Sequence, residues 1–117
     1  MSEKIMIVDD DPAITMYLEA LFTDHGYETC IADDGKAALE LYETEKPDLI
    51  TLDLEMPEEW GPRFFRKISK TQGFNTPVIV ISGLSGRQHS IPKAQGFFPK
   101  PFDPEAVIDK VKELLSS

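Results

Sequence analysis

The sequence predicts an α/β fold in which a parallel β-sheet is covered by helices on both faces. Short apolar runs alternate along the chain with longer segments whose apolar residues recur at helical spacing. Each short run is apolar almost throughout, which is typical of a strand buried on both faces. The predicted strands are residues 4–8, 28–32, 49–52, 78–81 and 96–98.

Composition limits the possible functions. A chain of 117 residues is long enough for one domain with a hydrophobic core, so we expect residues 1–117 to form a single domain. The net charge of −9 disfavours non-specific binding to nucleic acid or to anionic membranes. No apolar run is long enough to span a membrane, and the beginning of the chain lacks a signal-peptide pattern. The single cysteine, Cys30, is interpreted as a small buried hydrophobe, and we expect a cytoplasmic protein.

Two helices are predicted in the first half of the chain. Asp11 is the expected N-cap of the first, which has Pro12 at its first position and ends at Gly26. Its expected buried face consists of Ile14, Tyr17, Leu18, Leu21 and Phe22. Asp33-Asp34-Gly35 leads into the second helix, which runs to about Glu45 with Ala38, Leu41 and Tyr42 facing inward.

The second half contains two more predicted helices and one weak segment. Gly61-Pro62 begins a helix to about Gln72 with Phe64, Phe65 and Ile68 facing inward. Between 84 and 95 the apolar pattern is weak, and a glycine and a proline interrupt it, so we expect at most one or two turns there. Asp103 is the expected N-cap of a last helix, from Pro104 to about Leu115.

Polar residues follow the predicted strands at the points where they end. Asp9 and Asp10 follow the first strand, Asp53 the third, Ser82 the fourth and Lys100 the fifth. The carboxyl ends of parallel strands meet at one edge of the sheet, so these side chains should converge. Crowded carboxylates repel one another unless a cation is present, and all-oxygen ligation suits Mg²⁺. The lysine and the hydroxyl would then hold an anion beside the metal, and a phosphoryl group is the natural candidate.

Four segments, each at a strand end, carry a family resemblance. They are Ile-Val-Asp9-Asp10-Asp-Pro-Ala-Ile, Pro-Asp-Leu-Ile-Thr-Leu-Asp53-Leu-Glu-Met-Pro, Pro-Val-Ile-Val-Ile-Ser82 and Phe-Pro-Lys100-Pro101-Phe. Together and in this order they resemble the receiver domain of two-component response regulators over essentially the whole chain. The resemblance implies a flavodoxin-like (βα)5 sandwich whose five-stranded parallel sheet has the order 2-1-3-4-5.

The resemblance also implies roles for individual residues. Asp53 would accept a phosphoryl group from a sensor histidine kinase or a phosphotransfer protein, and thereby switch binding to a downstream target. Asp10, Asp53 and the backbone carbonyl of Glu55 would bind Mg²⁺, with Asp9 acting through water. Ser82 and Lys100 would receive the phosphoryl oxygens, the peptide bond between Lys100 and Pro101 would be cis, and Phe97 would change rotamer with Ser82.

The chain departs from the family pattern near the fourth helix. The stretch between Ser82 and Lys100 is short for the family, which implies an atypical fourth helix, and Gly83 replaces the usual alanine. Trp60 stands where the family often has an acidic residue. Its indole is interpreted either as a contact for a partner protein or as packed against the following helix. These departures leave open a pseudo-receiver that binds proteins without phosphorylation. A magnesium-dependent phosphohydrolase would leave Asp53 without a role, and a flavin carrier would need a Ser/Thr-rich loop that is missing.

Overall fold

A computed structural model describes residues 2–83 and 94–116 of the chain. Its strands are β1 (Lys4–Val8), β2 (Glu28–Ala32), β3 (Leu49–Leu52), β4 (Val78–Ser82) and β5 (Gly96–Pro99). Its helices are α1 (Pro12–Asp24), α2 (Gly35–Glu45), α3 (Trp60–Ser69) and α4 (Pro104–Leu115), and the 3-10 turn η1 (Pro57–Glu59) precedes α3. No helix in these two ranges is long and apolar enough to cross a membrane.

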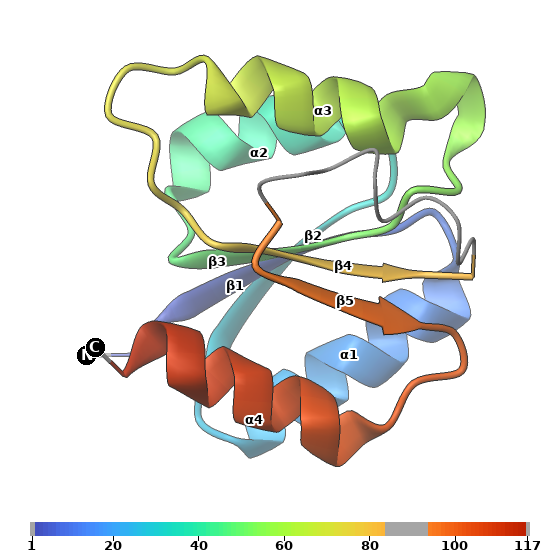
Figure 1. Cartoon of the computed structure of the whole chain (residues 1–117), viewed down its shortest axis with the longest axis vertical. Helices are drawn as coiled ribbons and strands as arrows, with labels where there is room; N and C mark the ends of the chain where they lie inside the picture. Colours follow the sequence, from blue (N-terminus) through green and yellow to red (C-terminus); the bar gives the residue numbers. More distant parts are fainter. Residues whose placement is uncertain (1, 84–93, 117) are drawn as a thin grey trace.

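The five strands form one parallel sheet in the order β2-β1-β3-β4-β5, which confirms the predicted fold. Figure 1 shows α2 and α3 on one face of this sheet and α1 and α4 on the other. Strands in the middle of such a sandwich contact helices on both sides, which explains why β1, β3 and β4 are apolar runs. All strands point the same way, so the residues that follow them lie along one edge.

The hydrophobic core has two layers because successive strand residues face opposite sides of the sheet. On the side of α2 and α3, the buried residues include Met6, Ala38, Ile50, Leu52, Phe64, Phe65, Ile68 and Val80. On the side of α1 and α4, they include Ile5, Ile7, Leu18, Phe22, Leu49, Ile79, Ile81, Val107, Ile108 and Val111. Burial of both layers holds the strand ends in fixed positions relative to one another.

The helix starts follow the predicted capping pattern. The carboxylate of Asp11 accepts the backbone N–H of Ala13 at 2.9 Å, and α1 has proline in its first turn. Asp103 caps α4 in the same way, accepting the N–H of Glu105 at 3.0 Å. At α2 the cap is Asp34, whose carboxylate accepts the N–H of Ala37 at 2.7 Å.

Two burial predictions were wrong. Tyr17 was expected on the buried face of α1, but it is 48% exposed, and its ring lies 5.8 Å from that of Phe102. It sits at the margin of the apolar stripe, whose centre is Leu18 and Phe22. Cys30 is half-buried because β2 is an edge strand of the sheet.

Helix α3 begins at Trp60 and ends at Ser69, whereas the sequence predicted residues 61–72. The N–H groups of Lys70 and Thr71 bond to carbonyls three residues back, so the helix tightens and stops before Gly73, which has φ +79. Before α3, the turn η1 contains Glu58 with φ 59, a left-handed backbone that is uncommon for a residue with a side chain. The segment 84–95, in which at most one or two turns were expected, lies outside the described ranges except for its last two residues.

Candidate functional site

Backbone hydrogen bonds extend the sheet into the predicted site residues. The N–H of Asp53 donates to the carbonyl of Val8 at 2.9 Å, and the N–H of Asp9 donates to the carbonyl of Ala32 at 3.2 Å. On the other side, the N–H of Lys100 donates to the carbonyl of Ser82 at 3.1 Å. The positions of Asp9, Asp53, Ser82 and Lys100 are therefore set by strand pairing.

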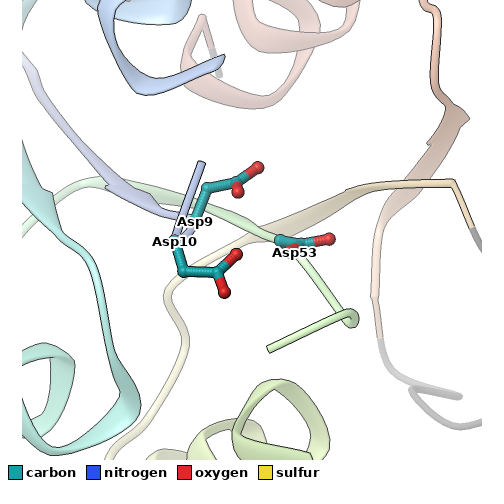
Figure 2. A group of neighbouring side chains, drawn as sticks. All are labelled: Asp9, Asp10 and Asp53. Carbon is teal, nitrogen blue, oxygen red and sulfur yellow. The ribbon is translucent and has the colours of Figure 1, made fainter. Parts of the chain in front are cut away.

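Three carboxylates meet at the ends of β1 and β3. Figure 2 shows Asp9 and Asp10 at the end of β1, beside Asp53 at the end of β3. One carboxylate oxygen from each lies within 4.8 Å of the other two. Asp9 and Asp53 are each only 3% exposed, whereas Asp10 is exposed to solvent. The structure thus brings together the three acids that the sequence predicted.

Lys100 supplies a positive charge to this cluster. Its Nζ lies 2.8 Å from Oδ2 of Asp9 and 3.5 Å from Oδ1 of Asp53. Burial lowers the pKa of Lys100, but the hydrogen bond and the charges of Asp9 and Asp53 outweigh burial and leave that pKa above its ordinary value. Lys100 is therefore a cation throughout the physiological range, and its peptide bond to Pro101 is cis, as predicted.

The two buried acids, Asp9 and Asp53, resist ionisation when no metal is present. Burial, followed by the charge of Asp9, raises the pKa of Asp53 to about 6, against the opposing effects of a backbone N–H and of Lys100. Burial also raises the pKa of Asp9, although hydrogen bonds from Lys100 and from the N–H of Asp11 lower it. One ammonium therefore compensates only part of the negative charge that the folded chain concentrates here.

The acidic cluster fits a hard divalent cation. Oδ1 of Asp53 is fully buried, and no residue in the described ranges donates a hydrogen bond to it. A buried anionic oxygen without a donor is costly, and a metal ion would satisfy it. The ligand atoms available from Asp9, Asp10 and Asp53 are all carboxylate oxygens, the type that Mg²⁺ prefers. The role of the Glu55 carbonyl as a further ligand stays a prediction.

Ser82 and Phe97, the two residues of the predicted switch, lie on the neighbouring strands β4 and β5. Ser82 is the last residue of β4, is completely buried, and pairs in register with Pro99 of β5. Phe97 lies on β5 and packs, half-buried, against the core layer beneath α2 and α3. The two residues thus lie on adjacent strands, and the rotamer change of Phe97 stays a prediction.

The indole of Trp60 packs against the start of α2, beside the acidic site. A Cβ on Gly35, at the start of α2, would run into the Trp60 ring, so the indole lies directly against that glycine. The guanidinium of Arg63 lies 4.3 Å from the Trp60 ring centroid, within cation–π range. Trp60 therefore packs against the start of α2 and, through Arg63, against the following helix as predicted, and a partner contact stays a prediction.

Sequence reasoning missed two backbone contacts beside Asp53. A Cβ on Gly61 would stand 2.5 Å from the carbonyl oxygen of Asp53, so α3 begins in contact with the end of β3. The N–H of Gly83 donates to Oε1 of Glu55 at 2.7 Å, a bond between the loops that follow β3 and β4. The replacement of alanine by Gly83 was the sequence signal that could have pointed to this second contact.

Comparisons with known proteins give the same picture over nearly the whole length. The model of the family described as response regulator receiver domain matches residues 5–112. Protein Rrf1 of Nitratidesulfovibrio vulgaris is 36% identical over 118 residues, spanning 100% of this chain and 86% of that protein. Chemotaxis protein CheY of Thermotoga maritima is 33% identical, spanning 97% of this chain and 98% of that protein. The crystal structure of response regulator protein TrrA from Thermotoga maritima in complex with Mg(2+)-BeF matches with TM-score 0.88 at 30% identity, covering 97% of this chain and 99% of that one.

Proposed function

The chain belongs to the response regulator receiver domain family, and from that premise we propose that Asp53 is its phosphoacceptor. Proteins of this family accept phosphoryl groups in two-component signalling and are not classical enzymes. The observation that carries the residue assignment is the buried Oδ1 of Asp53, which has no hydrogen-bond donor in the described part of the chain. A carboxylate at a strand end has two oxygens, so Asp53 can bind a metal through one and act as a nucleophile through the other.

The proposed reaction is an in-line transfer from a phosphohistidine of a sensor kinase or phosphotransfer protein. A carboxylate oxygen of Asp53 forms a bond to phosphorus while the phosphorus–nitrogen bond of the donor breaks. The imidazole leaves with that electron pair and takes up a proton, and Asp53 becomes an acyl phosphate. Small donors such as acetyl phosphate would react in the same way, and attack by water on phosphorus would return the free carboxylate and inorganic phosphate.

The remaining site residues bind and orient the transferred group. Lys100 and Ser82 would receive phosphoryl oxygens, and Lys100 stays charged for this task because Asp9 and Asp53 raise its pKa. Asp9, Asp10 and Asp53, with the carbonyl of Glu55, would hold Mg²⁺. When bound, Mg²⁺ offsets negative charge on the transferring phosphoryl group.

Modification of Asp53 would switch binding to a downstream protein through Ser82 and Phe97. We propose a cytoplasmic protein whose partners are other proteins, because the net charge of −9 disfavours direct contact with nucleic acid or anionic membrane. No finding favours the pseudo-receiver alternative. The ion pair between Lys100 and Asp9 and the proximity of Lys100 to Asp53 form a set that a pure binding module would not require.

Intact mass spectrometry tests the assignment directly. The protein is incubated with acetyl phosphate and Mg²⁺, and one acid-stable, base-labile phosphoryl adduct per chain is expected. Asp53→Asn should abolish the adduct, whereas Asp109→Asn, which removes an exposed carboxylate from α4, should leave its yield unchanged. An adduct that survives in Asp53→Asn, or none in the unmodified sequence, would overturn the proposal.

A further inference from the structure

A single hydrogen bond joins the two loops on either side of the phosphoacceptor. The backbone N–H of Gly83 donates to Oε1 of Glu55 at 2.7 Å, and 28 residues separate the two in sequence. Leu52 of β3 pairs with Val80 of β4, and three residues further along each strand come Glu55 and Gly83. The bond therefore spans the exits of two neighbouring strands, beside Asp53 on one and Ser82 on the other.

The absence of a side chain at Gly83 gives the Glu55 carboxylate room to form this bond. A Cβ at position 83 would stand 2.6 Å from Oε1 of Glu55, closer than real Cβ atoms approach other atoms. Gly83 does not have the positive φ found at Gly26 and Gly73, so backbone conformation does not account for the glycine. A side chain at position 83 would instead have to displace the Glu55 carboxylate from its present place.

Glu55 is held near Asp53 although both are acidic. Burial and the charge of Asp9 are the main causes of the raised pKa of Asp53, the charge of Glu55 adds a small part, and the backbone N–H of Glu55 bonds to the Asp53 carboxylate. The side chain of Glu55 is exposed, and in the described ranges its hydrogen-bond donor is the Gly83 amide. The backbone N–H of Gly83, which lies at the edge of the proposed phosphoryl site, is thus already hydrogen-bonded to the carboxylate of Glu55.

We propose that the bond between Glu55 and Gly83 is a latch, closed while Asp53 is unmodified and opened when Asp53 carries a phosphoryl group. This inference rests on the proposed function. A phosphoryl group brings a charge of about −2 beside Glu55, which repels its carboxylate. The freed N–H of Gly83 then becomes available to a phosphoryl oxygen. Because the latch must open first, Glu55 opposes modification of Asp53, and its release changes the backbone environment at the end of β4.

Three variants separate the bond from the charge. Glu55→Ala removes both, and Glu55→Gln removes the charge but keeps a carbonyl acceptor. Gly83→Ala keeps the charge and displaces the carboxylate through its new Cβ. The matched control is Glu58→Gln, which removes a carboxylate from an exposed position on the same loop.

The first measurement is the initial rate of adduct formation from acetyl phosphate and Mg²⁺. Glu55→Ala and Gly83→Ala should both react about two- to tenfold faster than the unmodified sequence, the range expected for one hydrogen bond. Glu55→Gln should be intermediate, and Glu58→Gln should react at the unmodified rate. Circular dichroism spectra establish that each variant is folded.

The second measurement is the amide resonance of Gly83 in ¹⁵N-labelled protein. Mg²⁺ and beryllofluoride, a phosphoryl mimic, should move this resonance in the unmodified sequence. In Glu55→Ala the resonance should already be displaced before either is added. A shift of the same size in the unmodified sequence and in Glu55→Ala on adding the mimic would show that the bond to Glu55 does not open, and would overturn the latch.

The outcomes distinguish the latch from the function on which it rests. The latch is wrong if Gly83→Ala reacts at the unmodified rate, if Glu58→Gln accelerates as much as Glu55→Ala, or if beryllofluoride leaves the Gly83 resonance in place. If no protein of the series forms an adduct, the unmodified sequence included, then the proposed function fails and the latch fails with it.

Discussion

Replacing Asp53 with asparagine should stabilise the metal-free protein at pH 8. Burial and the charge of Asp9 raise the pKa of Asp53 to about 6, so the folded state holds a proton that the unfolded state releases near pH 3.8. Below pH 3.8 the carboxyl is protonated in both states and does not affect stability. Between pH 3.8 and 6 the free-energy cost of ionising Asp53 in the folded state grows, and above pH 6 this loss of stability is complete. Asparagine carries no charge at any of these pH values, so the Asp53→Asn variant does not have this cost.

The size of the effect follows from that pKa. A pKa of about 6 against an ordinary value of 3.8 corresponds to roughly 3 kcal/mol at ~1.4 kcal/mol per pH unit. Solvent at the mouth of the site screens the charge, so we expect Asp53→Asn to gain about 1–2 kcal/mol in free energy of unfolding at pH 8. About half of that gain should remain at pH 5, and none below pH 3.8.

Urea denaturation in the presence of EDTA measures this gain, with the emission of Trp60, the single tryptophan, as the probe. Asp109→Asn serves as the control because it removes the same formal charge from an exposed position on α4. A gain that does not change between pH 5 and pH 8, or a loss of stability at pH 8, would refute the reasoning. Either result would mean that Asp53 is not electrostatically strained in the metal-free fold.

Three further predictions concern the cation, the metal and the packing around the site. Lys100→Ala should slow adduct formation from acetyl phosphate by about 100-fold, because the substitution removes a preorganised positive charge. Intact mass spectrometry measures this rate, and a rate near that of the unmodified sequence would contradict the role of Lys100. Mg²⁺ at 100 times its dissociation constant should raise the free energy of unfolding by about 2.7 kcal/mol, as measured by urea titration. The same Mg²⁺ concentration should raise the free energy of unfolding of Asp10→Asn much less. Gly35→Ala should cost about 1–3 kcal/mol in urea denaturation because its Cβ meets the Trp60 ring, and a smaller cost is expected in a Trp60→Ala background.

The strands and the convergence of the site residues could be predicted because local patterns determine them. A strand buried on both faces must be apolar throughout, so the bounds of β1 and β3 coincide with the predicted runs, and the bounds of the edge strand β2 also agree although it is only partly buried. Once the strands are parallel, Asp9, Asp53 and Lys100 must lie at one edge, whatever their separation in sequence. The same reasoning placed the caps Asp11 and Asp103, which depend on neighbouring residues only.

Contacts between distant loops could not be predicted in this way. The bond from Gly83 to Glu55 depends on one side-chain conformation and on two loops that the chain connects only through α3 and β4. The contact of Trp60 with Gly35 depends on how α2 and α3 pack, and the left-handed Glu58 depends on how the chain enters α3. In the first two cases the sequence supplied an unusual residue, a glycine or a tryptophan, but not the partner that it contacts, and for Glu58 it supplied no signal.

The three consecutive aspartates after β1 illustrate how chemically identical neighbours acquire separate tasks. Asp9 is buried and paired with Lys100, Asp10 is exposed and is proposed as a metal ligand, and Asp11 caps α1. Each task follows from position along the backbone and not from residue type. Losing any one of the three would still leave an acidic pair after the strand, yet one task would go unfilled and the others would shift by one residue. A deletion of one residue in this stretch is therefore expected to remove one of these three contacts, even though the chain would remain acidic there.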